Sequence, residues 1–264
     1  MEINRTNINE LVNKCSVKPD KDYGQNFLVE PLIAEKIVDA LEVNDNDYVL
    51  EIGPGLGSLT HFLYQKSKLD VCDIDSRMID FLKIFYKEDI NYILNDVRKI
   101  DVSSYSKIIG NLPYNITTEL VTFLLMNSNA KKMILMCQSE AFNRFYDLEG
   151  ENYGPVSVML HLLGTPKKLL TVKPGSFYPA PNCNSLVFSF DLEPVTDKET
   201  IIKVYKMCKS IFLNRRKTIL NNLSHIVSKD KASLILKELN IEENRRPETI
   251  SPSEYLQMFV LVNK

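Results

Sequence analysis

The chain has 264 residues, of which 44% are hydrophobic and 25% charged, and its formal net charge is −2. This length is sufficient for one well-buried core with a small second domain, and the composition is that of an ordinary globular protein. The total charge does not by itself indicate a nucleic-acid-binding protein. It does not exclude one either, because phosphates are met by local basic patches rather than by the net charge.

Cysteine usage and hydropathy both point to a reduced compartment away from membranes. The cysteines are widely spaced and include no C-x-x-C pair, so we expect neither a zinc site nor a disulfide framework. They stand at positions 15, 72, 137, 183 and 208. No apolar run approaches the roughly 18 residues of a membrane span, and the polar N-terminus is unlike a secretory signal. We therefore expect a soluble cytoplasmic protein that does not contact a membrane.

The first two thirds of the chain alternate between strand and helix patterns. Residues 1–26 are polar and predict a short helix with a loosely held lead-in, and residues 31–41 predict a helix that begins at a proline. Apolar runs then predict strands at 48–52, 69–74, 91–95, 107–111 and 131–138. Helical spacing predicts the intervening helices at 58–66, 78–87 and 118–127. This alternation favours a parallel sheet with helices on both faces.

A helix, two strands and a helical tail complete the prediction. Pro155 and Gly164 bracket an expected helix, and strands are expected at 167–172 and 185–190. The composition changes near residue 194, and from there the pattern is helical. We expect a small helical domain over 194–264, with helices at 199–213, 217–227, 231–239 and 251–262. The last of these opens with Ser-Pro-Ser-Glu, which is typical of a capped helix start.

A glycine-rich turn follows the first expected strand, where residues 51–58 read EIGPGLGS. Glycines there let the backbone approach a ligand closely, and the carboxyl end of a first strand is where α/β sheets bind nucleotides. The spacing Gly53, Gly55, Gly57 resembles the first motif of S-adenosylmethionine methyltransferases more than the G-x-G-x-x-G of a dinucleotide fold. A dehydrogenase and a purely structural turn remain the alternatives for this stretch alone.

Acidic residues end the next two strands. Asp73 stands some 20 residues after the glycines, where a carboxylate can accept hydrogen bonds from both ribose hydroxyls of a nucleotide-like ligand. We expect Asp75 to cap the following helix instead. Asp96, at the end of the third strand, is a candidate acceptor for the amine of an adenine ring. By itself that signal is weak, because aspartate is common in turns.

The most specific motif is Asn-Leu-Pro-Tyr at residues 111–114, directly after the fourth strand. An adenine amine is not basic, because its lone pair is delocalised into the ring. A carboxamide oxygen and a backbone carbonyl can accept its two hydrogens, which turns the lone pair towards a methyl donor. Pro113 fixes the turn that points the Leu112 carbonyl inwards, and Tyr114 offers a ring on which a base can stack. The motif alone also fits a plain strand-end turn.

Taken together, these stretches resemble the ribosomal RNA adenine dimethyltransferases of the small subunit. The resemblance rests on GQNFL within residues 23–28, on EIGPGLG at 51–57 and on GNLPYNI at 110–116. It continues through KPGSFYPAP at 173–181 to RRKTILNN at 215–222, and so covers nearly the whole chain. It implies a Rossmann-like class I methyltransferase domain over 1–193, with a mostly parallel seven-stranded sheet, and a helical RNA-contacting domain over 194–264.

The resemblance also implies which residues form the site. In this family the residues that contact S-adenosylmethionine correspond to Asn26, Leu28, Gly53, Gly55, Asp73, Ile74, Asp96, Val97 and Asn111, with Ile74 and Val97 sandwiching the adenine ring and Asn111 touching the target amine as well. Catalysis is implied for Asn111, Leu112, Pro113, Tyr114 and Phe177, the two aromatic rings gripping a flipped-out adenine. RNA contacts are implied for Arg215, Arg216 and Lys217.

The implied activity is dimethylation of the N6 amine of two adjacent adenosines near the 3′ end of 16S ribosomal RNA, on a pre-30S particle, by a monomeric enzyme. No metal is expected, since the three histidines show no ligand spacing. Two departures from the family pattern occur: Gln138 is followed by Ser-Glu-Ala instead of Lys-Glu-Val, and position 73 is Asp where Glu is frequent. The alternatives are a 23S ribosomal RNA adenine methyltransferase that confers macrolide resistance and a non-catalytic RNA-binding assembly factor.

Overall fold

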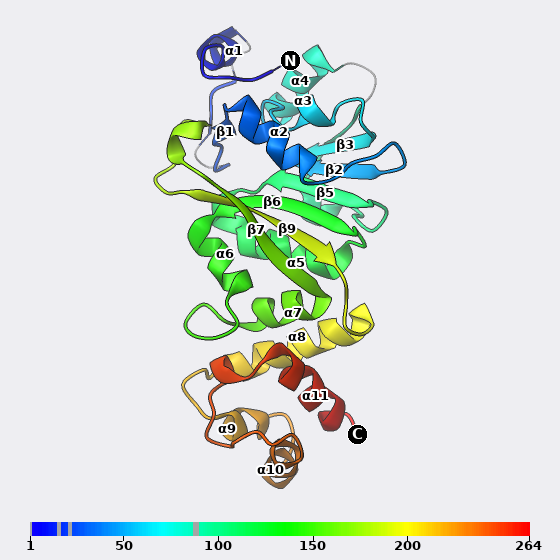
Figure 1. Ribbon diagram of the computed structural model, residues 1–264, viewed down its shortest axis with the longest axis vertical. Helices are drawn as coiled ribbons and strands as arrows, with labels where there is room; N and C mark the ends of the chain where they lie inside the picture. Colours follow the sequence, from blue (N-terminus) through cyan, green and yellow to red (C-terminus); the bar gives the residue numbers. More distant parts are fainter. Residues whose placement is uncertain (1, 15–16, 21–22, 87–89) are drawn as a thin grey trace. The chain divides into compact units, whose positions relative to one another are not determined.

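The computed structural model describes residues 2–14, 17–20, 23–86 and 90–264, and the chain forms two compact units. The first unit comprises Met1–Ala141 and Lys167–Leu192, and the second comprises Phe142–Pro166 and Glu193–Lys264 (Figure 1). All residues from 193 onwards therefore belong to the second unit, and this start lies next to the boundary expected from the sequence. The segment Phe142–Pro166, however, packs with the helical unit.

A seven-stranded sheet forms the centre of the first unit, in the order β4-β3-β2-β5-β6-β9-β7. Strands β2 to β6 run parallel to one another, and β9 is antiparallel to β6. The expectation of a mostly parallel seven-stranded sheet is confirmed. The strands are β2 Tyr48–Ile52, β3 Lys68–Asp73, β4 Ile90–Leu94, β5 Lys107–Asn111, β6 Lys132–Gln138, β7 Gly164–Val172 and β9 Ser185–Leu192.

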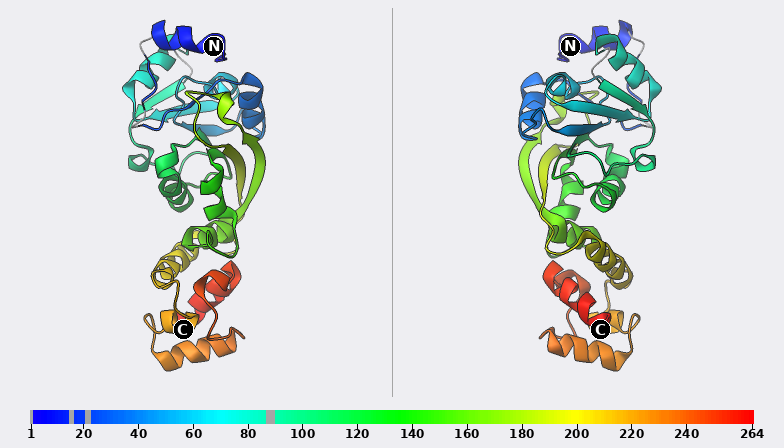
Figure 2. Two further views of the ribbon diagram at one scale, coloured as in Figure 1. Left: turned by 90° about the vertical axis from the view of Figure 1, so that its left-hand side faces the viewer. Right: turned by 90° about the vertical axis from the view of Figure 1, so that its right-hand side faces the viewer.

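Helices cover both faces of this sheet. One buried apolar cluster joins the helices α1 to α4 to alternate strand residues such as Val49, Val71 and Ile109, as the period-2 geometry of strands requires. The buried residues of α5 lie outside that cluster, and Figure 2 shows α2 and α5 on opposite sides of the sheet. The bounds are α1 Ile8–Lys14, α2 Pro31–Asp39, α3 Thr60–Leu63, α4 Ser76–Phe85 and α5 Thr117–Asn127.

A second, two-stranded sheet holds the N-terminal segment on this unit. Strand β1, Phe27–Leu28, pairs antiparallel with β8, Phe177–Tyr178, so that Leu28 stands opposite Phe177. The Ser58 hydroxyl also donates to the Leu28 carbonyl at 2.6 Å. The segment that precedes α2 is thereby fixed beside the glycine-rich turn.

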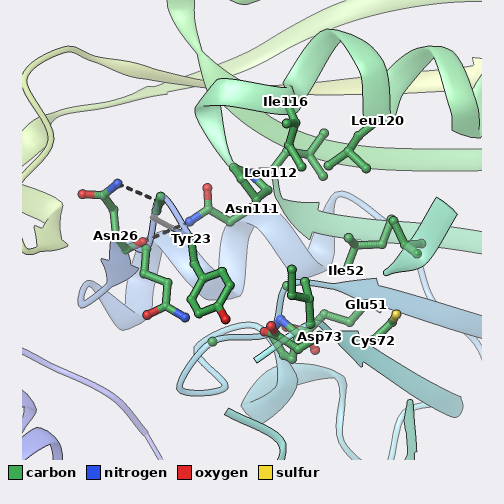
Figure 3. Close-up of a pocket in the computed structure, with 18 of the residues that line it drawn as sticks. Tyr23, Asn26, Glu51, Ile52, Cys72, Asp73, Asn111, Leu112, Ile116 and Leu120 are labelled. Atoms are coloured by element: carbon green, nitrogen blue, oxygen red, sulfur yellow. Dashed lines mark hydrogen bonds between the residues drawn. The ribbon is translucent and has the colours of Figure 1, made fainter. Parts of the chain in front are cut away.

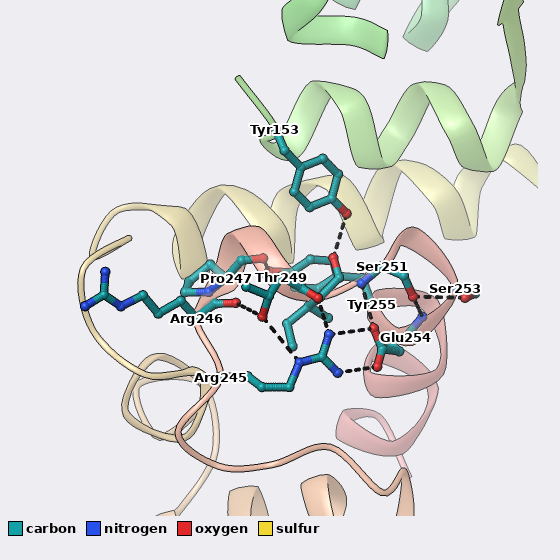
Figure 4. A network of polar contacts seen from close by, with 10 residues as sticks. Tyr153, Arg245, Arg246, Pro247, Thr249, Ser251, Ser253, Glu254 and Tyr255 are labelled. Atoms are coloured by element: carbon teal, nitrogen blue, oxygen red, sulfur yellow. Dashed lines mark hydrogen bonds and ion pairs between the residues drawn. The ribbon is translucent and has the colours of Figure 1, made fainter. Parts of the chain in front are cut away.

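The second unit is helical, and a partly buried polar network ties its C-terminal part together. Arg245 donates to the Glu254 carboxylate at 2.6 Å, and Ser251 and Glu254 cap α11 reciprocally, as expected from the sequence (Figure 4). The Tyr153 hydroxyl donates to the Ile250 carbonyl at 2.7 Å. The bounds are α6 Ser139–Tyr146, of which Phe142–Tyr146 belong to this unit, α7 Pro155–Leu163, α8 Lys198–Phe212, α9 Ile219–Leu223, α10 Lys229–Glu238 and α11 Pro252–Val262.

Most element predictions are confirmed, and four are wrong in detail, the first being the helix expected at 217–227, which is only Ile219–Leu223. The helix expected at 58–66 is only Thr60–Leu63, since the glycine turn extends further than its pattern indicated. Helix α6 was not expected, and β7 begins directly at Gly164 instead of at 167. The expected helix end at residue 87 lies outside the described residues, as does Cys15. The other four cysteines are free thiols, and no helix in the described part is long and apolar enough to cross a membrane.

Candidate active site

A cavity of about 240 Å³ opens at the carboxyl ends of β2, β3 and β5. The strand order reverses between β2 and β5, and this switch point is where α/β sheets place their ligands. Figure 3 shows side chains from the strand ends and from the N-terminal segment converging on the cavity. The expected site residues on its wall are Asn26, Leu28, Gly53, Gly55, Asp73, Ile74, Asp96, Val97, Asn111, Leu112, Pro113 and Tyr114.

The glycine turn leaves room for a ligand because side chains are excluded there. Gly53 and Gly55 have φ angles of 62° and 54°, a region that favours glycine. A Cβ atom on Gly55 would lie 3.0 Å from the ring of Phe27, and one on Gly53 would point towards the Asn111 carbonyl, 3.6 Å away. The backbone of the turn therefore forms a wall of the cavity that a ligand can approach closely.

Asp73 and Asp75 lie in different environments. Asp75 caps α4 by accepting from the Arg77 amide at 3.0 Å, which confirms the expected cap. Asp73 is buried, accepts a hydrogen bond from the Asp75 amide at 2.9 Å and faces the cavity. Burial raises the pKa of Asp73 to about 6, and the Asp75 amide opposes that shift. Asp73 is therefore a mostly ionised acceptor at neutral pH that faces the cavity, and its contact with ribose hydroxyls stays a prediction.

The three residues expected to bind the adenine ring, Ile74, Val97 and Asp96, differ in exposure and in their contacts. Ile74 is 58% exposed although it is apolar, as suits a side chain on which a flat ring is to rest, and Val97 lies buried nearby on the same cavity wall. Asp96 accepts from the Arg98 amide at 2.9 Å and pairs with its guanidinium. The side-chain bond from Arg98 lowers the pKa of Asp96. Sequence reasoning missed Arg98, which also lines the cavity.

The Asn111 carboxamide has one satisfied end and one unsatisfied end. Its Nδ2 donates to the Asn26 carbonyl at 3.2 Å (Figure 3). Its Oδ1 is buried and has no hydrogen-bond partner in the described part of the chain. A buried acceptor left unpaired costs on the order of 1–3 kcal/mol, so this oxygen is an acceptor prepared for a donor from a ligand.

The rest of the motif is anchored to neighbouring strands. The Leu112 amide donates to the Met136 carbonyl in β6 at 2.9 Å. The Tyr114 hydroxyl lies 2.6 Å from the Ser185 hydroxyl at the start of β9. Burial raises the pKa of Tyr114, so the phenol is neutral at physiological pH. The hydroxyl is thus occupied, and the ring remains as the surface that Tyr114 presents to the cavity.

Glu51 is a cavity residue that sequence reasoning left unassigned. It is fully buried at the end of β2 and accepts from the Thr60 hydroxyl at 2.7 Å. Burial raises its pKa to about 8, so the side chain is largely protonated at pH 7. The signal was present in the sequence, since Glu51 is the first residue of the glycine motif, but only its burial reveals its protonation state.

Phe177 is not on the cavity wall. It is 4% exposed in β8 and belongs to the apolar cluster that holds β1 in place. Its expected contact with a target adenine stays a prediction, and one that requires its ring to become accessible.

The basic triplet of the second unit, Arg215, Arg216 and Lys217, differs in its contacts from one residue to the next. The Arg215 guanidinium donates to the carbonyls of Gly150 and Glu151 and lies 3.6 Å from the Glu248 carboxylate. Arg216 and Lys217 are exposed. The expected RNA contact of all three stays a prediction, and only the last two present their charges outward.

Among the described residues, no cluster of His, Cys, Asp or Glu is suited to hold a metal ion.

The chain matches one protein family over most of its length, and its relatives carry names of the same kind. Residues 16–264 match the family described as "Ribosomal RNA adenine dimethylase". A "Ribosomal RNA small subunit methyltransferase A" of Malacoplasma penetrans is 37% identical over 94% of this chain and 93% of its own length. A protein of the same name from Mycoplasma capricolum subsp. capricolum is 35% identical over 93% of this chain and 98% of its own.

Solved structures share the fold. A dimethyladenosine transferase from Plasmodium falciparum superimposes with a TM-score of 0.75 at 24% identity, covering 90% of this chain and 97% of that one. The 23S rRNA methyltransferase ErmE gives a TM-score of 0.72 at 19% identity, covering 90% of this chain and all of that one. At these identities the likeness concerns the fold alone.

Proposed function

This chain belongs to the ribosomal RNA adenine dimethylase family, and we propose that its cavity uses S-adenosylmethionine to dimethylate the N6 amine of adenosines in small-subunit ribosomal RNA. The enzyme class follows from the family. The small-subunit substrate is supported by relatives of that name at 31–37% identity over nearly the full chain. The sequence identity to the 23S rRNA methyltransferase ErmE lies below that range, and the likeness to it extends to the fold only.

One observation carries the chemical part of the proposal, namely the unpaired Oδ1 of Asn111 beside the glycine-lined cavity. A carboxamide oxygen there accepts a hydrogen of the target amine and draws electron density back onto its nitrogen. The second hydrogen is assigned to the Leu112 carbonyl. Tyr114 and, once accessible, Phe177 supply the stacking that a base loses when it leaves its helix.

The residues on the cavity wall fit the methyl donor. Gly53 and Gly55 give the close backbone approach, Asp73 the acceptor for ribose hydroxyls, and Ile74 with Val97 the apolar surfaces for an adenine ring. Asn26, Leu28 and Asp96 complete the proposed cofactor set. When bound, S-adenosylmethionine supplies a methyl group on a sulfonium, which is already strongly electrophilic. The protein's task is therefore to position the amine, and positioning of this kind provides much of the acceleration.

The proposal further assigns the two methylated adenosines to adjacent positions near the 3′ end of 16S RNA. It takes a pre-30S particle as the substrate, met by a monomeric enzyme in the cytoplasm. Residues 194–264 are assigned to RNA contact, with Arg216 and Lys217 as the exposed members of the basic triplet.

Methyl transfer to defined ribosomal substrates tests this function. The protein is incubated with labelled S-adenosylmethionine and with under-methylated 30S particles, 50S particles or protein-free 16S RNA. We expect label only in the small-subunit RNA, recovered as N6,N6-dimethyladenosine after digestion. Label in 50S particles instead would refute the small-subunit assignment, and no transfer to any substrate would refute the enzymatic one.

A further inference from the structure

The side chain of Gln25 bonds both to its own N-terminal segment and to the residue that caps α4. Its Oε1 accepts from the Asp20 amide at 2.9 Å, and its Nε2 donates to Oδ2 of Asp75 at 2.8 Å. Gln25 itself lines the cavity, whereas Asp75 stands two residues after the cavity carboxylate Asp73. One carboxamide thus connects the N-terminal segment to the start of α4.

Arg77 extends this connection. Its guanidinium engages both carboxylate oxygens of Asp75, with Nη2 at 2.6 Å from Oδ2 and Nε at 2.9 Å from Oδ1. Nη1 donates to the Lys18 carbonyl at 3.3 Å, and Nη2 lies 3.7 Å from the Asp20 carboxylate. Asp75 is only 4% exposed. Burial alone would raise its pKa, but the bonds from Arg77 and Gln25 outweigh burial and lower it. A buried, ionised carboxylate therefore holds the N-terminal segment through two donors.

Residues 23–28, which we call the strap, are fixed at their other end as well. The Asn26 carbonyl accepts from Nδ2 of Asn111, and the Leu28 carbonyl accepts from the Ser58 hydroxyl. Every residue of the strap lines the cavity. The strap is therefore bonded to Asp75 through Gln25, to Asn111 through Asn26 and to Ser58 through Leu28.

We infer that Gln25, Asp75 and Arg77 are positioning residues that hold the strap across the S-adenosylmethionine site and so set the affinity for that cofactor. The inference rests on the proposed function for the identity of the ligand. A strap already held in place loses less conformational freedom when the ligand binds, and such preorganisation increases affinity. It also keeps the Asn26 carbonyl in place to orient Asn111, so that the same segment positions groups for the cofactor and for the target amine.

The chain offers a comparison that separates this role from simple anchoring of the N-terminus. Arg5 pairs with Glu30 at 2.5 Å and is 61% exposed, and neither residue lines the cavity. Arg5→Ala removes a contact of the same N-terminal segment without touching the strap. If anchoring were the only role of the Gln25 contact, the two sites would respond alike.

Gln25→Glu is the direct test. It retains an acceptor for the Asp20 amide but sets a second carboxylate against Asp75, where like charges repel. We expect the dissociation constant for S-adenosylhomocysteine, measured by calorimetry, to rise at least tenfold, with a parallel rise in the KM for S-adenosylmethionine and a smaller fall in kcat. Gln25→Ala, which adds no charge, should weaken binding several-fold. Arg5→Ala should leave the dissociation constant within about twofold.

A reciprocal exchange provides the rescue. In Gln25→Glu combined with Asp75→Asn, an amide again faces a carboxylate, and asparagine caps a helix as well as aspartate does. We expect the pair to bind S-adenosylhomocysteine more tightly than Gln25→Glu alone but more weakly than the unmodified protein, because the amide nitrogen that replaces Oδ2 of Asp75 can no longer accept from Nη2 of Arg77. Hydrogen exchange of the cofactor-free proteins should show faster exchange of residues 23–28 in Gln25→Glu and a return to slow exchange in the pair.

The outcomes are distinguishable. Unchanged affinity in both Gln25→Glu and Gln25→Ala, or a pair as weak as the single variant, would overturn the positioning role and leave the proposed function intact. Failure of the unmodified protein to bind S-adenosylhomocysteine would overturn the proposed function, and the positioning role with it.

Discussion

Asn111 donates from its Nδ2 to the carbonyl of Asn26, 3.2 Å away, and this one bond decides which atom of the carboxamide remains for a ligand. With the nitrogen engaged, the buried oxygen is the free end. The reverse orientation would present a donor to a target amine, which is itself a donor, and could not draw its hydrogens away. The N-terminal strap thus contributes to the chemistry of a motif that lies 85 residues further along the chain.

Cofactor affinity should depend on the ionisation of Asp73. Its pKa is raised to about 6 by burial, so the carboxylate that we assign to the ribose hydroxyls is present above pH 6 and is lost as the pH falls. Between pH 7.5 and 5.0 the dissociation constant for S-adenosylhomocysteine should rise about tenfold, following the ionised fraction. Asp73→Asn should bind more weakly at pH 7.5 and show a flatter profile. Calorimetry across this pH range would contradict the assignment if both proteins had the same slope.

Glu51 should make the folded protein more stable at lower pH. Its folded pKa of about 8 lies above the ordinary value of 4.5, so between these values the folded state binds a proton that the unfolded state releases. The free energy of unfolding therefore falls as the pH rises from 4.5 to 8, by an amount on the order of a few kcal/mol. Glu51→Gln should gain in melting temperature relative to the unmodified protein, and more at pH 8 than at pH 5.

The matched control for this experiment is Glu35→Gln, since Glu35 is exposed on α2. Its melting temperature should track that of the unmodified protein at every pH. A difference between Glu51→Gln and the unmodified protein that stayed constant from pH 5 to pH 8 would show that Glu51 is not protonated in the folded state.

The ring and the hydroxyl of Tyr114 should contribute unequally. The hydroxyl is occupied by Ser185 at 2.6 Å, so Tyr114→Phe removes an anchoring bond but keeps the ring on the cavity wall. Tyr114→Ala removes the stacking surface, which is worth about 1–3 kcal/mol per base. Steady-state kinetics on 30S particles should show a loss of catalytic efficiency within about fivefold for Phe and of at least tenfold for Ala. Equal losses would mean that the ring does not stack on the base.

The basic triplet should separate into RNA-binding and structural residues. Removing the exposed charges of Arg216 and Lys217 together should weaken RNA binding and reduce the slope of log affinity against log salt by about 0.7–0.9 per lost phosphate contact. Arg215→Ala should instead lower the melting temperature, because its guanidinium bonds the Glu151 carbonyl at 2.6 Å inside the helical unit. A salt slope unchanged by the double variant would remove these two residues from the interface.

The strand–helix alternation and the cavity motifs were predictable because each rests on local pattern. Apolar runs of five to seven residues became β2, β5 and β6, and the glycines stand at the switch point they indicated. Helix α6 has only eight residues and follows β6 with no intervening turn, so the sequence pattern did not separate it from the preceding strand. The two-residue strands β1 and β8 form only because the folded chain brings them together.

The less predictable part of the site consists of contacts between distant side chains. Nothing in the local pattern around Gln25 points to Asp75, 50 residues away. In the same way, the burial of Phe177 depends on its pairing with Leu28, which no spacing reveals. Sequence motifs identified the groups that meet the ligand, whereas the bonds that hold those groups in place required the tertiary structure.

The most direct test of the account is single-turnover methylation of under-methylated 30S particles by Asn111→Ala. An amine acceptor of this kind contributes on the order of 10²–10³ to the rate. We predict a loss of at least 100-fold in methyl transfer with unchanged binding of 30S particles, and no loss in Asn127→Ala, which removes an exposed asparagine at the end of α5. Methyl transfer by Asn111→Ala within a few-fold of the unmodified rate would contradict the central claim that the Asn111 oxygen prepares the adenine amine.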